Sequence, residues 1–288
     1  MIKKEFTKIF ENAATESARD IDLVGFSKNI LTKQKSNLPK LFRYSPADYY
    51  NIRSLETETL FLSPIGNMND IFEGLSCRID DNVINQIEKM QDIAYLKSFS
   101  ENKNHLLMWA HYANNYTGMC VEYDLSNLSE EVLYHLYPIH YSKIRFPNKD
   151  LSKVIEEHSD LKRMNEDYCY PNECDHIKDI MSLFLTKSEV WSYEKEWRIV
   201  ATYPQIYNTA EDLDDKQKLL YILNDQNVSV KSCIKSVYLG AKMKQNIKDH
   251  IKEICQCKLN NIPVYSTRLS KSNYELEIAL ETNNKQRK

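Results

Sequence analysis

The densest group of reactive side chains lies between Lys187 and Val200, in the segment KSEVWSYEKEWRIV. Glu194 and Glu196 stand one residue apart, and Arg198 follows on the same short stretch. Two carboxylates that close repel each other, so one of them tends to hold its proton above the usual pKa unless a cation lies between them. Such a pair suits acid/base catalysis or the stabilisation of a positively charged sugar.

Two local structures fit this spacing. The run Tyr193 to Tyr203, YEKEWRIVATY, ends in β-branched and aromatic residues, which predicts a strand. Side chains alternate along a strand, so Glu194, Glu196 and Arg198 would then share one face. The alternative is a helix on which Glu194 and Arg198 form a solvated ion pair worth roughly a few tenths of a kcal/mol. Both interpretations stay open on these residues alone.

Short apolar runs bounded by proline, glycine or polar turns predict the strands that would position this segment. Strands are expected at 41–45, 59–63, 94–100, 119–125 and 138–146, the last as a partner of 119–125. Helices are expected within 1–37, 47–58, 80–91, 101–118 (with Gly118 as a left-handed cap), 147–180 and 181–188, and 204–230 reads as a polar insertion. The tail predicts a strand, helix, strand unit, with IKSVYLGA, a helix over 244–255, and IPVYSTRLS.

Because strands outnumber long helices in the middle of the chain and helices lie between them, an α+β fold is predicted. We expect a single compact domain with a mixed or antiparallel sheet core flanked by helices. Residues 1–37 are expected to form a helical N-terminal extension, 38–280 the α+β domain, and 281–288 a polar tail.

Composition narrows the function classes. The chain has 288 residues, a formal net charge of −3 and five glycines. The glycine-rich phosphate loops of Rossmann and P-loop proteins are missing, so those nucleotide sites are not expected. The charge balance gives no broad basic surface, although a local basic cleft for nucleic acid stays possible. No stretch resembles a secretory signal or a membrane span, so a cytoplasmic protein without a membrane partner is expected.

The cysteines predict reduced thiols. Seven of them are scattered through the chain, and an odd number favours free thiols over a disulfide framework. Cys169, Cys174 and His176 have spacings that match no standard zinc pattern, as do Cys255 and Cys257. No metal is expected.

Three features in chain order resemble the R, S-x-S, E-x-E arrangement of ADP-ribosyltransferases related to bacterial toxins: Arg43, Ser98 with Ser100, and Glu194 with Glu196. The resemblance implies that the arginine and serines position NAD, that Glu196 stabilises the sugar cation, and that Glu194 orients or activates the acceptor. Cleavage of the nicotinamide bond builds positive charge on the ribose, which a fixed carboxylate stabilises. A guanidinium matches the oxygens of a pyrophosphate.

Other side chains are candidates for contacts with the same substrate, each with a purely structural alternative. A histidine on a helix is often a core residue, and Asn and Asp often cap turns, so these alternatives stay open. The candidates are Trp109, Tyr112 and Tyr193 for stacking on nicotinamide, His111 as an acid, base or positioning group, Asn69 and Asp70 for ribose hydroxyls, and Arg198 for phosphate.

The chain from Leu41 to about Ile278 also resembles the bacterial domain of unknown function 2971 family. The residues that carry this resemblance are LFRYS, TLFLSPIGNMNDIFEG, SFSENKNHLLMWAHYANNYTGMCVEYD, FLTKSEVWSYEKEWRI, SVYLGAKM and IPVYSTRLSKSNYELEI. The family usually has a proline where Ile71 stands here. This resemblance implies no particular reaction.

Three functions remain as hypotheses. The first is an enzyme that cleaves NAD as its substrate and transfers ADP-ribose to water or to a macromolecular acceptor, protein or nucleic acid, in the manner of a toxin or an anti-phage effector. The second is a non-catalytic module that binds a nucleotide or a partner protein. The third is a metal-dependent phosphodiesterase using Asp70, Glu73, Glu194 and Glu196.

Overall fold

The computed structural model describes residues 1–15, 26–31, 33–75, 77–78, 94–133, 135–144, 146–150, 183–202 and 227–281. The chain divides into two compact units, which are described one at a time. Unit 1 comprises Met1–Leu38, Leu60–Ser98 and Leu128–Val228. Unit 2 comprises Pro39–Thr59, Phe99–Asn127 and Ser229–Lys288.

Unit 1 begins with an amphipathic helix, α1 (Ile2–Thr15), followed by the short helices η1 (Phe26–Leu31) and η2 (Lys35–Asn37). Ile2, Phe6 and Phe10 recur every four residues, so they fall on one face of α1, and all three are buried. The ring of Phe6 lies 4.8 Å from that of Phe10 and 4.9 Å from that of Phe26. This aromatic cluster anchors the N-terminal helix within unit 1.

Strands of unit 1 carry the segment with the paired glutamates. The hydrogen-bonded order β5-β11-β7 places β11 (Glu196–Thr202) beside the antiparallel β7 (Leu136–Pro138), with β3 (Ser63–Pro64) on β5 (Ala94–Ser100). A parallel pair, β8 (His140–Ser142) and β10 (Thr186–Ser188), lies outside this order. Also present are η3 (Ile65–Asn67), β4 (Cys77–Arg78), α6 (Glu130–Leu133), β9 (Phe146–Asp150) and η5 (Glu189–Glu194).

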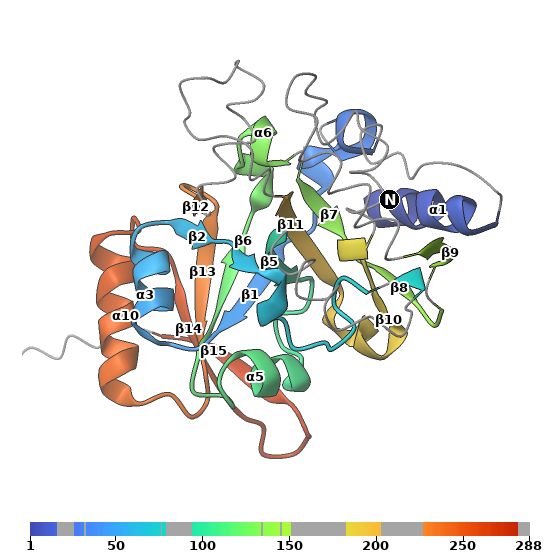
Figure 1. Cartoon of the computed structure of the whole chain (residues 1–288). Helices are drawn as coiled ribbons and strands as arrows, with labels where there is room; N and C mark the ends of the chain where they lie inside the picture. Colours follow the sequence, from blue (N-terminus) through green and yellow to red (C-terminus); the bar gives the residue numbers. More distant parts are fainter. Residues whose placement is uncertain are drawn as a thin grey trace, which may run out of the picture. The chain divides into compact units, whose positions relative to one another are not determined.

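Unit 2 holds a mixed set of strands in the order β15-β14-β13-β6-β1, with the last residues of β5 beside β1 (Figure 1). β13 and β14 are parallel, and the other neighbours in this order are antiparallel. The elements are β1 (Leu41–Ser45), α3 (Tyr49–Glu56), α5 (Leu106–Tyr112), β6 (Met119–Tyr123), η4 (Leu125–Asn127), β13 (Ile234–Leu239), α10 (Gln245–Cys257), β14 (Val264–Leu269) and β15 (Leu276–Leu280). β2 (Thr59–Phe61) and β12 (Asn227–Ser229) cross the unit boundaries in sequence.

Helix α10 connects the parallel strands β13 and β14, as such a crossover requires. Its buried side chains, Ile251, Ile254 and Cys255, recur at helical spacing and form its inner face. α3 packs against α10 (Figure 1), and Glu56 forms an ion pair with Lys258, just past the end of α10. The strand, helix, strand unit predicted for the tail is confirmed.

The α+β class with a mixed sheet flanked by helices is likewise confirmed. Strands 41–45 and 94–100 have the predicted bounds, and α1, α3 and α5 lie within predicted helices. The domain boundaries and the likeness to the ADP-ribosyltransferase fold stay predictions.

Three local predictions are wrong. The run 138–146 does not form one strand beside 119–125: β7 pairs with β11, β8 pairs with β10, and β6 pairs with β1 and β13. The segment 181–188 is not a helix throughout, because Thr186–Ser188 form β10. The predicted run 59–63 is two short strands, β2 and β3, rather than one.

Gly118 does not act as a left-handed cap for α5. The positive φ angles after that helix belong to Asn114, Asn115 and Tyr116, at 45°, 52° and 69°. A Cβ on Gly118 would lie 2.2 Å from the carbonyl oxygen of Ser45. The glycine is therefore needed for the close approach of two backbones.

The predicted helix over 80–91 lies outside the described residues, as do 151–180 and nearly all of the insertion over 204–230. The helix predicted over 147–180 is wrong at its start, because Phe146–Asp150 form the strand β9. Cys169, Cys174 and His176 lie outside them as well. Within the part of the chain that is described, no helix is long and apolar enough to span a membrane.

Candidate functional site

The paired glutamates lie at a change of local structure. Glu194 ends the 3-10 helix η5, Lys195 takes a left-handed conformation with φ of 47°, and Glu196 begins β11. The predicted strand therefore starts at Glu196 rather than Tyr193, and the helix alternative is wrong for 196–202. Glu196 and Arg198 share one face of the strand, as predicted from their spacing.

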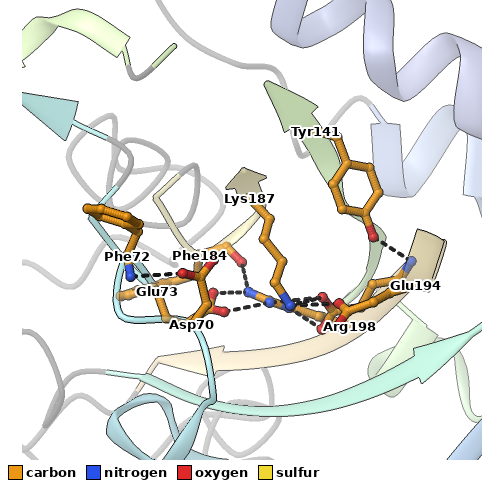
Figure 2. Close-up of polar contacts among 9 residues, drawn as sticks. Asp70, Phe72, Glu73, Tyr141, Phe184, Lys187, Glu194 and Arg198 are labelled. Atoms are coloured by element: carbon orange, nitrogen blue, oxygen red, sulfur yellow. Dashed lines mark hydrogen bonds and ion pairs between the residues drawn. The ribbon is translucent and has the colours of Figure 1, made fainter. Parts of the chain in front are cut away.

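Arg198 lies at the centre of the site and its side chain is fully buried. Its Nε donates to Oε1 of Glu196 at 2.7 Å, and Nη2 donates to Oε2 at 3.0 Å. On its other side, Nη1 and Nη2 donate to the two carboxylate oxygens of Glu73 at 2.5 and 2.9 Å (Figure 2). Nη1 also donates to the carbonyl oxygen of Phe184 at 2.7 Å. These five contacts use all the donors of a guanidinium.

Lys187, on β10, supplies the second cation. Figure 2 shows its side chain extending toward Arg198. Its Nζ lies 2.7 Å from Oε2 of Glu194 and 3.3 Å from Oε2 of Glu196. The ammonium also lies 4.9 Å from the centre of the Trp191 ring, a distance that allows a cation–π interaction. Lys187 therefore bridges the two glutamates.

These cations determine the protonation state of Glu196. Burial alone would raise the pKa of its carboxyl, but Arg198, Lys187 and a hydrogen bond from Ser98 lower that pKa to about 2. The backbone N–H of Glu196 donates to the hydroxyl of Tyr141 at 2.8 Å. Glu196 is thus a buried, oriented and ionised carboxylate. The raised pKa that two adjacent acids produce without a cation does not arise here.

The cluster places three carboxylates beside two cations. Glu73, Glu194 and Glu196 face Lys187 and Arg198, and these five side chains are at most 7% exposed. The same partners raise the pKa of Arg198 and of Lys187, against the lowering that burial causes. Lys187 and Arg198 thus act as counter-ions of the paired glutamates.

Asp70 caps the turn that carries Glu73. Its Oδ1 accepts a hydrogen bond from the N–H of Phe72 at 3.0 Å, and its carbonyl accepts from the N–H of Glu73 at 3.0 Å. Asn69 is exposed beside it. The capped turn considered for these residues is therefore present, and it presents the Glu73 carboxylate to Arg198 (Figure 2).

Tyr193, the remaining candidate of this unit, is half-buried on η5, with its ring 6.1 Å from that of Trp191. Its phenol has a raised pKa, because of burial and the neighbouring Glu194. Unit 1 thus brings together Ser98, Glu194, Glu196 and Arg198 among the residues predicted from the sequence.

Arg43 and Ser100 belong to unit 2, where both take part in local hydrogen bonds. Nη2 of Arg43 donates to Oδ1 of Asn51 at 2.7 Å, and Asn51 in turn bonds to Asp48, the N-cap of α3. Burial lowers the pKa of Arg43, although Tyr123 and Asp48 oppose this. The hydroxyl of Ser100 accepts from the N–H of Asn102 at 2.9 Å.

The predicted aromatic contacts of unit 2 lie on α5. Trp109 is fully buried and meets Tyr44 edge to face at 5.2 Å, and its Nε1 has no hydrogen-bond partner among the described residues. His111 is exposed, with its ring 6.3 Å from that of the half-buried Tyr112. A core histidine, the structural alternative for His111, is therefore wrong.

A cavity of about 230 Å³ lies beside the charged cluster in unit 1. It is lined by Phe72, Leu75, Ser142, Lys143, Ile144, Thr186, Lys187 and Ser188. Lys187 thus lines the cavity, and its ammonium hydrogen-bonds to both glutamates.

The described residues hold no group of three or more His, Cys, Asp or Glu side chains placed to hold a metal ion. Glu73 and Glu196 are both bound to Arg198, and Asp70 caps its turn, which leaves the carboxylates of the phosphodiesterase hypothesis engaged with protein groups.

Residues 108–199 match the family described as a protein of unknown function (DUF2971). The match covers the residues from α5 to the first half of β11, and so includes Lys187, Glu194, Glu196 and Arg198. No curated protein and no solved structure matches the chain. The family likeness inferred from the sequence is supported over this range, and it names no reaction.

Sequence reasoning did not find two parts of this site. Glu73 was not predicted to pair with an arginine, whereas it binds the guanidinium of Arg198, 125 residues away. Thr186 and the cavity were not foreseen, because a short apolar run such as MSLFLTKS does not distinguish a helix from a strand.

Proposed function

We propose that this chain is an NAD-cleaving enzyme, an ADP-ribosyltransferase or NAD glycohydrolase, in which Glu196 stabilises the positively charged ribose. The observation that carries the proposal is the state of Glu196: an ionised carboxylate fixed by Arg198 and Lys187 and hydrogen-bonded by Ser98. A serine of the S-x-S pair thus bonds to the second glutamate of the E-x-E pair, which supports the resemblance that suggested the function.

In the proposed reaction, the bond between ribose C1′ and the nicotinamide nitrogen breaks, and its electron pair leaves with nicotinamide. Positive charge develops on C1′ and the ring oxygen, near which a fixed negative charge lowers the barrier. Water or an acceptor then forms a new bond to C1′ and releases one proton. Glu196 needs no proton transfer of its own for this role, which agrees with a pKa of about 2.

Glu194 is proposed to orient or activate the acceptor. Its carboxylate is held by Lys187 at 2.7 Å, next to Glu196. Transfer to water, to protein and to nucleic acid all release nicotinamide, so the first assay follows this shared product.

The test is release of nicotinamide from NAD by the purified chain and by the Glu196→Gln variant. We expect the wild type to release nicotinamide and the variant to lose roughly 10²- to 10³-fold in rate, the scale found when one preorganised electrostatic group is removed. Glu277→Gln, an exposed carboxylate paired with Arg268, is the matched control and should keep the wild-type rate. Equal rates in wild type and Glu196→Gln would refute the role of Glu196, and binding of NAD without turnover would favour the non-catalytic module.

A further inference from the structure

The cavity next to Lys187 lies where the parallel strands β8 and β10 end. Ser142 and Ser188 are the last residues of these strands and stand opposite each other in register. Leu75 and Thr186 are buried at 4% and 6% exposure, whereas Phe72 and Ile144 are 49% and 73% exposed. The cavity therefore combines a buried base with an exposed apolar rim.

One buried polar atom at this cavity is unused. The hydroxyl oxygen of Thr186, Oγ1, has no hydrogen-bond partner among the described residues. A buried hydroxyl without a partner costs free energy, and native structures rarely leave one without a compensating ligand or water. By contrast, the hydroxyl of Ser142 donates to the carbonyl of Ile144 and accepts from its N–H. Among the described residues, Thr186 is therefore a cavity-lining residue whose buried hydroxyl has an unsatisfied hydrogen-bonding capacity.

The cavity lining offers an anion one weakly paired cation, the ammonium of Lys143. Its lining residues include two lysines and no carboxylate. Lys187 is engaged with Glu194 and Glu196, but Lys143 is 82% exposed and pairs at 3.5 Å with Glu189, itself 52% exposed. An ion pair between such exposed groups is weak, so the ammonium of Lys143 can turn to a ligand at little cost.

We propose that this cavity binds a small organic anion that has an apolar or aromatic body. A phosphate or carboxylate group contacts Lys143 and the hydroxyl of Thr186, and the body packs against Phe72, Leu75 and Ile144. The volume of about 230 Å³ is below the roughly 300–1,000 Å³ of pockets that hold drug-sized ligands. It therefore suits a ligand about the size of a substituted benzene ring rather than a whole dinucleotide. No part of this proposal requires that the chain cleave NAD.

The experiment is calorimetric titration of the full-length chain with phenyl phosphate. Benzoate tests whether a carboxylate replaces the phosphate, inorganic phosphate lacks the ring, and benzyl alcohol lacks the charge. We expect phenyl phosphate or benzoate to bind at least fivefold more tightly than inorganic phosphate and benzyl alcohol. Affinity for inorganic phosphate or benzyl alcohol equal to that for the aromatic anions would overturn the proposal, as would no binding at all.

Two variants locate the binding. Thr186→Val should weaken binding of the aromatic anion roughly 2- to 10-fold, the effect of one neutral hydrogen bond, and Lys143→Gln roughly 10-fold, because it removes a charged donor. Lys235→Gln, at an exposed lysine outside the cavity, is the control and should bind like wild type. Unchanged affinity in both cavity variants would place the anion elsewhere and refute the site. A chain that binds phenyl phosphate but releases no nicotinamide would refute the proposed function alone.

Discussion

Glu73 and Arg198 form a two-point ion pair across 125 residues of sequence. The carboxylate comes from a turn capped by Asp70, and the guanidinium comes from β11. The opposite edge of the same guanidinium binds Glu196. One arginine thus connects a turn and a strand of unit 1 and fixes the orientation of the carboxylate proposed to act on NAD.

Replacing Arg198 with methionine should destabilise the protein by about 3–5 kcal/mol, the usual cost of removing one partner from a buried ion pair. The variant would leave three buried carboxylates facing Lys187 alone. The free energy of unfolding in urea measures the effect. Arg268→Met is the matched control, because Arg268 and Glu277 are 69% and 42% exposed, and such pairs contribute less than about 1 kcal/mol. Similar losses of stability in the two variants would show that the buried network contributes no more to stability than an exposed ion pair.

His135 should make the protein sensitive to mild acid. Burial lowers the pKa of this histidine to about 4, although its ring Nδ1 hydrogen-bonds to the carbonyl of Val200 at 3.1 Å. The unfolded chain has the ordinary pKa of 6.5 and binds the proton more readily, so stability is complete above pH 6.5 and falls as the pH drops toward 4. The expected loss is roughly 3 kcal/mol.

Urea unfolding at pH 7, 5.5 and 4 in the wild type and in His135→Asn measures this contribution. The variant should lose less stability than the wild type between pH 6.5 and 4, whatever its stability at pH 7. Glu196 titrates lower, with a pKa of about 2, so the stability lost through its protonation should appear mainly below pH 4.5. An identical pH dependence in the two proteins would contradict the assignment to His135.

Two buried threonines should respond differently to replacement by valine. The hydroxyl of Thr267 donates to the carbonyl of Leu239 at 2.9 Å, so Thr267→Val should cost about 1 kcal/mol or more. The hydroxyl of Thr186 has no partner among the described residues, so Thr186→Val should be neutral or stabilising. Thermal unfolding without added ligand compares the two. A larger loss at Thr186 than at Thr267 would mean that the Thr186 hydroxyl is already satisfied.

The elements that sequence patterns predicted well are those whose limits are set locally. β1 ends before Pro46, a residue that cannot continue a strand's hydrogen bonding, and α3 begins at the side-chain cap of Asp48. β10 could not be predicted in this way, because Thr186–Ser188 become a strand by pairing with His140–Ser142, more than 40 residues earlier. Tertiary pairing decides the structure of such short apolar runs.

In the site, too, only the contacts between residues close in sequence could be predicted. Spacing predicted that Glu196 and Arg198 share a face, since the alternation of side chains along a strand is local. Spacing could not reveal that Glu73 would occupy the far edge of the guanidinium, or that Lys187 would lie between Glu194 and Glu196. These contacts depend on how distant segments fold together, and they change the protonation expected for the glutamate pair.

Lys187 belongs to two environments: its ammonium joins Glu194 and Glu196, and the residue lines the cavity. A bound molecule that displaces the Lys187 side chain must alter the distances from Nζ to both carboxylates. Linkage is reciprocal, so a ligand in the cavity and a second ligand that changes those two contacts must change each other's affinity by the same factor. A single lysine side chain thus gives unit 1 the means to couple occupancy of one place to the electrostatics of another.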